Sequence, residues 1–323
     1  MKFTRNVLAF ILRSPLHTFL QTVMASVAEA TYRKRLEKKE EAVKSECKLS
    51  GDPPPSPPLL QRVLDALRPF LIIAMMIIKG FPAAIFFQMT HPSIHLFNPF
   101  RWIRLVQECG FAKILAFGDV IWRGYKQPLV EQASGKVLEI GAGTGENLKY
   151  YKNDNIETLY ALEPEQALSK ILAENIVKNG FADKSLLIPV GIDDRNKLGT
   201  YGVAENTFDT IVLVQVCCSL PNASAHFKYL QSLLKPGGKL IMFEHVASAD
   251  PITRLLQDLY TFAFWKRAAL GCELNRPSGL WMKEIGGWDK VSLLRPEIET
   301  SGSILPHDIG VFVKASYASM AHN

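Results

Sequence analysis

The chain has 323 residues, of which 48% are hydrophobic and 21% are charged, so it is too apolar for a disordered protein. Its 21 glycines and 19 prolines are close to ordinary usage, which excludes collagen-like and low-complexity chains. The five cysteines include no CxxC pair, so we expect neither a disulfide scaffold nor a zinc ribbon. Reduced thiols in a reducing compartment are the prediction.

The formal net charge of +6 is concentrated at the N-terminal end of the chain. Residues 1–48 hold 10 Lys and Arg against 5 Asp and Glu, whereas residues 136–323 hold 19 against 21. The C-terminal part therefore has no basic field that would attract a phosphate backbone. A nucleic-acid partner is not expected.

Residues 1–32 are interpreted as a targeting or amphipathic anchor segment. They contain no Asp or Glu before Glu29, and basic residues punctuate an apolar stretch. The apolar run at residues 7–12 is too short to span a bilayer. Such a start is typical of a mitochondrial presequence or an interfacial anchor, and an ordinary N-terminal helix is the alternative.

Residues 33–58 are interpreted as a linker. A run of charged residues at 33–48 has no apolar face to balance it, which is typical of a solvated helix or a disordered arm. The sequence GDPPPSPP at residues 51–58 follows, and its prolines favour a semi-rigid polyproline spacer.

Residues 59–100 form the most apolar stretch and are predicted to associate with a membrane. Residues 70–78 have no polar side chain, and residues 81–87 resume the run after Lys79 and Gly80. Eighteen residues are at the lower limit for a spanning helix, which needs about 20. Gly80 and Pro82 predict a break that suits a re-entrant or hairpin insertion, and a buried core helix is the alternative.

Residues 101–323 are predicted to form an α/β domain. Short apolar runs alternate with longer helical stretches after Gly135, which is typical of a parallel sheet covered by helices. The predicted strands are residues 136–140, 158–162, 185–190, 208–214, 239–243, 291–294 and 311–315. Amphipathic helices are expected at residues 165–179 and 223–234. Pro236, Gly237 and Gly238 predict a tight turn into the fifth strand.

A glycine-rich loop follows the first predicted strand. Gly141, Gly143 and Gly145 alternate with other residues, which lets the backbone turn sharply and approach a ligand closely. Glu163 lies about 20 positions further on, at the end of the second predicted strand. A carboxylate at that place is expected to bind the hydroxyls of a ribose.

The spacing of the loop distinguishes between nucleotide cofactors. The pattern is G-x-G-x-G, not the G-x-G-x-x-G that seats a pyrophosphate on a helix N-terminus. Glu139 precedes the loop, and its charge would repel a diphosphate but suit an ammonium group. We therefore predict S-adenosylmethionine, with Asp193 after the third strand accepting a hydrogen bond from the adenine amino group. A helix N-cap is the alternative role for Asp193, and the two roles are compatible.

Together these motifs resemble the class I S-adenosylmethionine-dependent methyltransferases. The resemblance includes the glycine loop, Glu163, residues 209–212 (DTIV) and residues 234–238 (LKPGG). Four stretches are more specifically similar to the membrane-associated methyltransferase-like 7 thiol methyltransferases and to related fungal mitochondrial-membrane methyltransferases. They are residues 145–151 (GENLKYY), 217–220 (CCSL), 243–246 (FEHV) and 271–276 (GCELNR). The resemblance implies a doubly wound, seven-stranded Rossmann-like sheet with an antiparallel last strand, preceded by a helical hydrophobic anchor.

The acceptor side of the site is predicted from the chemistry of methyl transfer. Displacement at a sulfonium depends on positioning and on removal of the proton of the acceptor. A thiol with a pKa of about 8.5 is already partly ionised near neutral pH, whereas a phenol needs a base. His245 and Glu244 are the candidate catalytic residues, with a purely structural role as the alternative for His245. The predicted substrate pocket consists of Cys218, Ser219, Asn275 and Arg276.

The predicted function is transfer of a methyl group to a small lipophilic acceptor at a membrane surface or within the bilayer. By resemblance the acceptor is a thiol, with a quinone-type or phenolic lipid as the alternative. A non-catalytic assembly factor with the same fold is a further alternative. No metal is expected. The predicted location is a mitochondrial membrane or the endoplasmic reticulum and lipid droplets.

Overall fold

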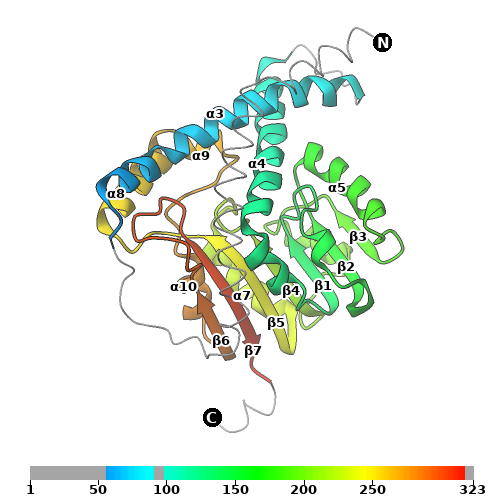
Figure 1. Ribbon diagram of the computed structural model, residues 1–323. Coiled ribbons are helices and arrows are strands. Elements are labelled where there is room, and N and C mark those ends of the chain that lie inside the picture. Colours follow the sequence, from blue (N-terminus) through cyan, green and yellow to red (C-terminus); the bar gives the residue numbers. More distant parts are fainter. Residues whose placement is uncertain (1–55, 91–97, 317–323) are drawn as a thin grey trace. The chain divides into compact units, whose positions relative to one another are not determined.

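The computed structural model describes residues 56–90 and 98–316 (Figure 1). The predicted anchor segment at residues 1–32 and all but the last three residues of the predicted linker lie outside the described residues. The structural statements below concern the described part of the chain.

Seven strands form one mixed sheet in the order β3-β2-β1-β4-β5-β7-β6. Their bounds are β1 Gly135–Ile140, β2 Ile156–Leu162, β3 Ser185–Ile188, β4 Phe208–Val214, β5 Leu234–His245, β6 Trp288–Leu294 and β7 His307–Lys314. The first five strands pair in parallel, and β7 runs antiparallel to both β5 and β6. The predicted seven-stranded sheet with an antiparallel last strand is confirmed, and every predicted strand overlaps an observed one.

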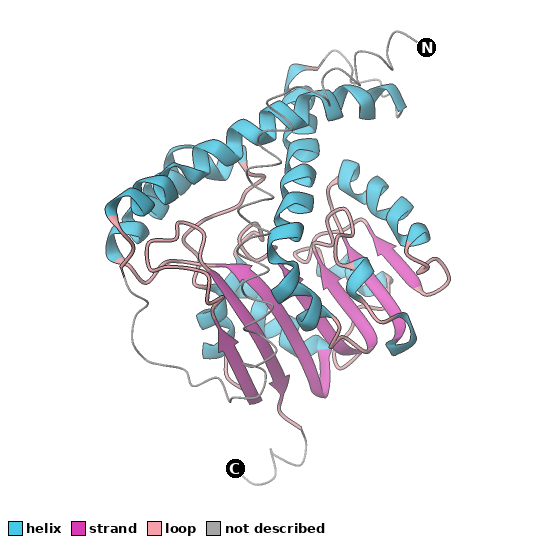
Figure 2. Ribbon diagram, in the orientation of Figure 1, coloured by secondary structure: helices cyan, strands magenta, loops and turns pink. Residues whose placement is uncertain are grey.

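Helices cover both faces of the sheet (Figure 2). Their bounds are α3 Leu59–Thr90, α4 Pro99–Val130, α5 Gln166–Lys178, α6 Arg195–Thr200, α7 Ala223–Leu233, α8 Pro251–Tyr260, α9 Lys266–Ala268 and α10 Ser278–Glu284. Short helical turns lie at η1 Leu148–Tyr150, η2 Asn153–Asn155 and η3 Thr261–Trp265. The predicted helices at residues 165–179 and 223–234 correspond to α5 and α7.

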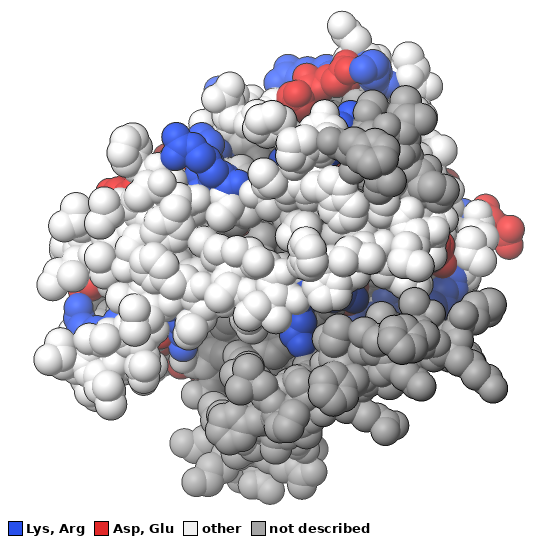
Figure 3. All heavy atoms as spheres, turned by 90° about the horizontal axis from the view of Figure 1, so that it is seen from above, with Lys and Arg blue, Asp and Glu red and all other residues white. Residues whose placement is uncertain are grey.

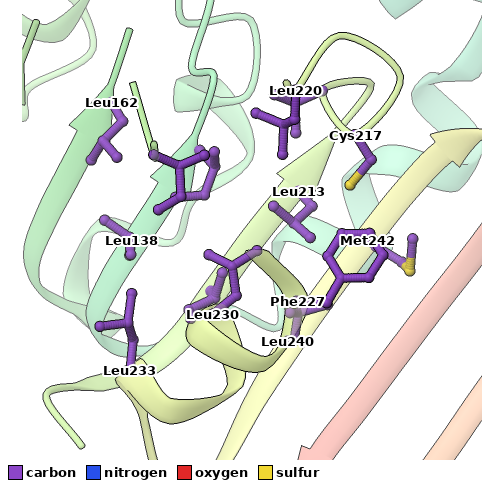
Figure 4. Close-up of a cluster of buried hydrophobic side chains, with 14 of the residues drawn as sticks. Leu138, Leu162, Leu213, Cys217, Leu220, Phe227, Leu230, Leu233, Leu240 and Met242 are labelled. Carbon is purple, nitrogen blue, oxygen red and sulfur yellow. The ribbon is translucent and has the colours of Figure 1, made fainter. Parts of the chain in front are cut away.

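Two hydrophobic clusters explain why the strands carry continuous apolar runs. Successive residues of a strand face opposite sides of the sheet, so a strand that is buried on both faces has no polar side. One cluster holds Leu138, Leu213 and Met242 under α7 and α10, with Cys217 pointing toward Leu213 and Met242 (Figure 4). The other cluster holds alternate strand residues such as Val137, Val212 and Ile241 under α4 and α5.

Strand β5 corrects the predicted turn at residues 236–238. The strand runs without interruption from Leu234 to His245, and its pairing with β4 shifts register between Phe208 and Thr210. Gly237 has a φ of 79°, which glycine adopts without steric cost. The glycines therefore form an irregularity within the strand instead of a turn before it.

Helix α3 corrects the predicted break at Gly80 and Pro82. The helix is continuous over 32 residues and contains Pro69 and Pro82. Gly80 is buried against α4, where a Cβ atom would lie 2.9 Å from the Cα of Gly110. The pair of glycines thus lets the backbones of α3 and α4 approach each other closely, so the conformational freedom of Gly80 serves helix packing and not a hairpin.

Helix α4 is fastened over the loop that follows β1. It begins at Asn98, whose Oδ1 accepts hydrogen bonds from two backbone N–H groups of the first turn. Further along, the buried Asp119 pairs with Lys126 at 2.7 Å and accepts a hydrogen bond from the Tyr150 hydroxyl at 2.8 Å. Lys149 also contacts Asp119, at 2.7 Å. One carboxylate therefore holds α4 against η1, which follows the glycine loop.

Candidate active site

The glycine loop lies at the carboxyl edge of the sheet, between β1 and η1. Gly141, Gly143 and Gly145 have φ values of 63°, 59° and 85°, a region in which L-residues with a Cβ atom are strained. A Cβ on Gly143 would lie 3.3 Å from Leu115 of α4, and one on Gly145 would lie 2.6 Å from Leu148. Both the backbone conformation and the packing therefore require glycine here.

Glu163 ties the end of β2 to this loop. Its Oε2 accepts a hydrogen bond from the Gly143 N–H at 2.8 Å, and its Oε1 accepts one from the Glu165 N–H at 2.8 Å. Burial raises the pKa of Glu163 to about 7, although these two N–H donors act to lower it. Each oxygen keeps a further lone pair, so the carboxylate is able to accept hydrogen bonds from a ribose.

Glu139 is buried beneath the loop and has two side-chain partners. Asn147 donates to its Oε1 at 2.7 Å and the Tyr151 hydroxyl donates to its Oε2 at 2.9 Å. Burial raises the pKa of Glu139, against the effect of these donors. In this structure Glu139 supports the loop from below through Asn147 and Tyr151, and its contact with a cofactor ammonium stays a prediction.

Asp193 and Asp194 follow β3 and have different roles. Asp193 is exposed, and the side chain that caps α6 belongs to Asp194, which accepts from the Lys197 N–H at 3.2 Å. The alternative role of Asp193 as a helix N-cap was therefore wrong. Asp193 remains available at the carboxyl edge, and its predicted contact with adenine stays a prediction.

Glu244 is held by the loop after β4. The carboxylate accepts hydrogen bonds from the backbone N–H groups of Val216 at 2.9 Å and Cys217 at 3.1 Å, and it is fully buried. Burial raises the pKa of Glu244 to about 7. Both oxygens of Glu244 thus bind backbone and hold the loop after β4, and its predicted catalytic role stays a prediction.

The predicted substrate-pocket residues divide into two groups. Cys218 and Arg276 are buried, and Ser219 next to them is half-buried. Arg276 donates to the backbone oxygens of Cys217 at 2.7 Å and Leu220 at 2.6 Å, so it shapes this loop from beneath. The side chain of Asn275 instead donates to Asp258 of α8 at 2.7 Å, in an exposed pair.

His245 lies at the end of β5 among buried sulfur atoms. Its Nε2 is 3.1 Å from the Sγ of Cys272, and Cys218, His245 and Cys272 place their ligating atoms within 4.8 Å of one another. Its Nδ1 is buried and has no hydrogen-bond partner within the described residues. The alternative of a histidine bonded to a backbone carbonyl is therefore not what the structure shows.

Three residues of this region were missed in the sequence. Gln215, which directly follows β4, has a φ of 55°, and strained backbone of this kind is concentrated at functional sites. Cys272 and Trp265 join the sulfur cluster, with the Trp265 Nε1 donating to Cys272 Sγ at 3.1 Å. The positive φ of Gln215 leaves no signal in the sequence. Cys272 and the aromatic-rich stretch that holds Trp265 are visible in the sequence, but the sequence does not show that they lie beside Cys218 and His245.

The residues present fit S-adenosylmethionine. Three glycines hold the loop in a positive-φ conformation, and the acids Glu163 and Asp193 follow the ends of β2 and β3, as the hydroxyls and amino group of a nucleoside require. The G-x-G-x-G spacing of the loop, with Glu139 before it, does not match the loop that seats the pyrophosphate of a dinucleotide. When bound, this cofactor supplies a sulfonium methyl group that is ready for displacement.

Replacing Gly143 with alanine should weaken binding of S-adenosylmethionine by at least about tenfold, which corresponds to about 1.4 kcal/mol. The new methyl group would stand in a strained backbone and press on Leu115 of α4. Gly202→Ala is the matched control, because Gly202 has a φ of 78° and nothing within 4 Å. Isothermal titration should show normal binding to the control, while both variants lose similar thermal stability. Equal binding by the two variants would place the cofactor elsewhere.

The affinity for S-adenosylmethionine should fall as the pH drops below about 7. The folded protein holds a proton on Glu163 up to a pKa of about 7, and a ribose requires the ionised carboxylate as its acceptor. Binding then releases a proton, so the affinity approaches a tenfold loss per pH unit below that value. Titration calorimetry over a pH series measures this slope.

Two variants show whether Glu163 or the nearby Glu108 causes the pH dependence of the cofactor affinity. Burial also raises the pKa of Glu108 to about 7, so Glu108 titrates in the same range. Glu163→Gln should bind weakly with a flat pH profile, whereas Glu108→Gln should keep the slope. A slope that persists in Glu163→Gln contradicts the assignment.

Comparison with known proteins agrees with this geometry. Residues 121–276 match the family described as a methyltransferase domain. Human thiol S-methyltransferase TMT1B is 29% identical over 146 residues, which are 45% of this chain and 57% of that protein. Human thiol S-methyltransferase TMT1A is 27% identical over 185 residues, covering 56% of this chain and 72% of that protein.

Two further comparisons cover other parts of the similarity. The mitochondrial methyltransferase OMS1 of Saccharomyces cerevisiae is 27% identical over 136 residues, which are 39% of this chain and 29% of that protein. A solved structure of an O-methyltransferase family protein from Burkholderia thailandensis aligns with a TM-score of 0.49 and 13% identity, over 68% of this chain and 61% of that chain. The chain spans little more than half the length of TMT1B.

The strand order, the glycine loop and the family match all indicate the same domain. The sheet order with β7 antiparallel between β5 and β6 agrees with the fold that the sequence resemblance implied. Residues 121–276 therefore match a methyltransferase domain, for which S-adenosylmethionine is the implied cofactor.

Proposed function

We propose that this chain transfers the methyl group of S-adenosylmethionine to a small lipophilic thiol. The observation that carries the proposal is how the charged side chains beside the acceptor-side loop are engaged in the described part of the chain. Glu244 binds two backbone N–H groups and Arg276 binds two backbone oxygens, and His245 is a nearby group that could accept a proton. A thiol needs the least help with its proton, because its pKa lies closest to neutrality.

Apolar surroundings support a lipophilic acceptor. Cys218, Cys272 and Leu274 form a buried cluster with Trp265, and half-buried Ile72 and Ile73 of α3 pack against it. An acceptor that enters here would lose its contact with water, so apolar groups gain from binding. The names of the relatives TMT1A and TMT1B, thiol S-methyltransferases, agree with this choice of acceptor.

Separate parts of the site would bind the cofactor and position the acceptor. The glycine loop and Glu163 would hold the nucleoside, and the backbone of residues 215–218 would set the approach of the acceptor. In-line displacement then depends on the distance and angle between two sulfur atoms, which a rigid loop controls. Glu244 and Arg276 act as positioning residues, since each fixes the backbone of Cys217.

A matched pair of acceptors tests the choice of thiol. Purified full-length protein with labelled S-adenosylmethionine should methylate thiophenol far faster than phenol, because the two share a ring and differ in the acidity and nucleophilicity of the accepting atom. A hydrophobic quinol in the same assay represents the lipid alternative. Faster labelling of phenol or quinol would contradict the thiol proposal. Cofactor binding without any methylated product would favour an assembly factor.

We also propose that the chain sits on a membrane through α3 and α8. Helix α3 is long and apolar enough to cross a membrane, with a mean hydropathy of 2.3 over its best window and 17% of that window buried. Yet α3 lies beside α8 along the domain: Arg62 pairs with Asp250 at 3.4 Å, and the Phe70 ring lies 5.4 Å from Tyr260. An arrangement flat on the surface suits these contacts better than a span.

The exposed faces of the two helices form one apolar surface, which we call the α3/α8 face. Its members are Leu60, Leu64, Leu67, Leu71, Ile78, Phe81, Ile252, Leu255, Leu259 and Phe262, all largely exposed. Figure 3 looks down on this side and shows a broad area without charge, with Lys and Arg at its margins. Surfaces of this size and composition mark contact sites. The predicted choice between a mitochondrial membrane and the endoplasmic reticulum or lipid droplets stays a prediction.

Charges placed on the α3/α8 face should release the protein from membranes. Leu255→Asp combined with Phe262→Asp should reduce flotation of the full-length chain with phosphatidylcholine vesicles, since a carboxylate resists transfer into lipid. Val177→Asp is the control, because Val177 is equally exposed, at 66%, on α5. Unchanged flotation of the double variant would show that another segment is the anchor.

A further inference from the structure

We propose that Cys218, His245 and Cys272 bind a zinc ion, and that the ion's fourth coordination position receives the sulfur of the acceptor. The first half of this proposal concerns a metal site that the sequence did not lead us to expect. The second half rests on the proposed thiol acceptor. The metal site and the acceptor are therefore tested by separate measurements.

The three side chains meet although they come from distant parts of the chain. Cys218 follows β4, His245 ends β5 and Cys272 follows α9. Their ligating atoms lie within 4.8 Å of one another, and the His245 Nε2 is 3.1 Å from the Cys272 Sγ. Tetrahedral zinc with Zn–S of about 2.3 Å and Zn–N of about 2.0–2.1 Å needs ligand separations of about 3.5–3.8 Å. These values lie between the 3.1 Å separation of His245 and Cys272 and the 4.8 Å limit for the three ligating atoms.

The donor set and its burial fit a soft metal ion. Two sulfurs and one imidazole nitrogen match the preference of zinc, and all three side chains are buried. The His245 Nε2 faces the sulfur of Cys272, so it is the ring nitrogen that would bind the ion.

The surrounding hydrogen bonds hold the ligands in place before any metal arrives. The Glu273 N–H donates to the Cys218 backbone oxygen at 2.9 Å, which fastens the two cysteine segments to each other. The Trp265 Nε1 donates to the Cys272 Sγ at 3.1 Å, and such an outer donor supports a metal-bound thiolate. Glu244 and Arg276 fix the backbone just before Cys218.

The site also has the coordination number of a catalytic centre. Structural zinc sites usually have four protein ligands, whereas catalytic sites have three and an open position. Val216, two residues before Cys218, packs against Gly141 of the cofactor loop, so the cluster lies close to that loop. Half-buried Ile73 and Phe264 pack around the cluster and would contact an apolar acceptor.

This arrangement gives the acceptor sulfur a defined place and charge. A thiol that binds the ion does so as a thiolate, and its proton leaves to solvent. The acceptor sulfur then forms a bond to the methyl carbon while the bond from that carbon to the sulfonium sulfur breaks. The electron pair of the broken bond stays on the departing sulfur, which leaves as a neutral thioether. The second product, the methyl thioether, is a weaker ligand and dissociates.

The metal content of the purified full-length protein tests the site without reference to activity. Elemental mass spectrometry should find zinc and protein in a one-to-one ratio, and Cys272→Ser and His245→Ala should each lose the metal. Cys217→Ala is the matched control, because Cys217 points into the other hydrophobic cluster (Figure 4). Zinc that is absent from the wild-type protein and is not taken up on addition overturns the proposal. So does full zinc content in both ligand variants.

Co²⁺ in place of zinc gives a spectroscopic test on the wild-type protein, so this test does not depend on whether variants fold. Wild-type protein loaded with Co²⁺ should show sulfur-to-cobalt charge-transfer absorption and the visible bands of tetrahedral cobalt. Added thiophenol should change these bands, whereas phenol should not. Tetrahedral bands that ignore thiophenol would overturn the role of the fourth position. Absent bands with a Cys218–Cys272 disulfide would overturn the metal site.

The two proposals fail in distinguishable ways. Methylation of thiophenol by protein that neither contains nor binds zinc or cobalt would leave the thiol function standing and remove the metal. A protein that contains one metal ion per chain but methylates phenol and not thiophenol would support the metal site and contradict the thiol function.

Discussion

Buried carboxylates at the carboxyl edge of the sheet are the constraint on which the site depends. Asp119 binds α4 to η1, Glu139 supports the glycine loop, Glu163 joins that loop to β2, and Glu244 holds the turn after β4. A buried carboxylate is costly unless donors surround it, so each of these acids fixes the groups that satisfy it. Hydrogen bonds to charged groups contribute about 1.5–3 kcal/mol each, enough to order a loop. The edge is thus shaped before a cofactor binds.

The sheet was predictable because burial on both faces leaves a strong signal. Residues 208–214 and 239–243 are continuous apolar runs, and in the structure alternate side chains enter the two clusters on either side. The glycine loop was equally visible, since positive φ values at three alternate positions demand glycine. The prediction of a break in α3 was wrong, because a glycine such as Gly80 can either interrupt a helix or allow two helices to pack closely. Only the position of Gly110, 30 residues later, decides that it serves helix packing.

The roles of the acceptor-side residues depend on contacts that the sequence does not reveal. Glu244 and His245 looked like a catalytic pair, but neighbours on a strand point to opposite faces, so they have separate partners. Glu244 reaches the backbone of Cys217 and His245 reaches Cys272. Strand periodicity was enough to separate the two residues, although not to identify Cys272. The three ligating side chains come from separate loops, which no spacing pattern connects.

Helix α4 links the α3/α8 face to the cofactor loop. On one side its Gly110 meets Gly80 of α3 with the two backbones in near contact, and on the other side Leu115 lies over Gly143. The first contact leaves no space for a side chain and the second is tightly packed, so a shift of α3 is expected to displace α4 and disturb the loop. Ile72 and Ile73 on α3 also pack against the cluster at Cys218. A membrane that holds α3 would therefore steady the cofactor side and the acceptor side together, because both are built against the same helix pair.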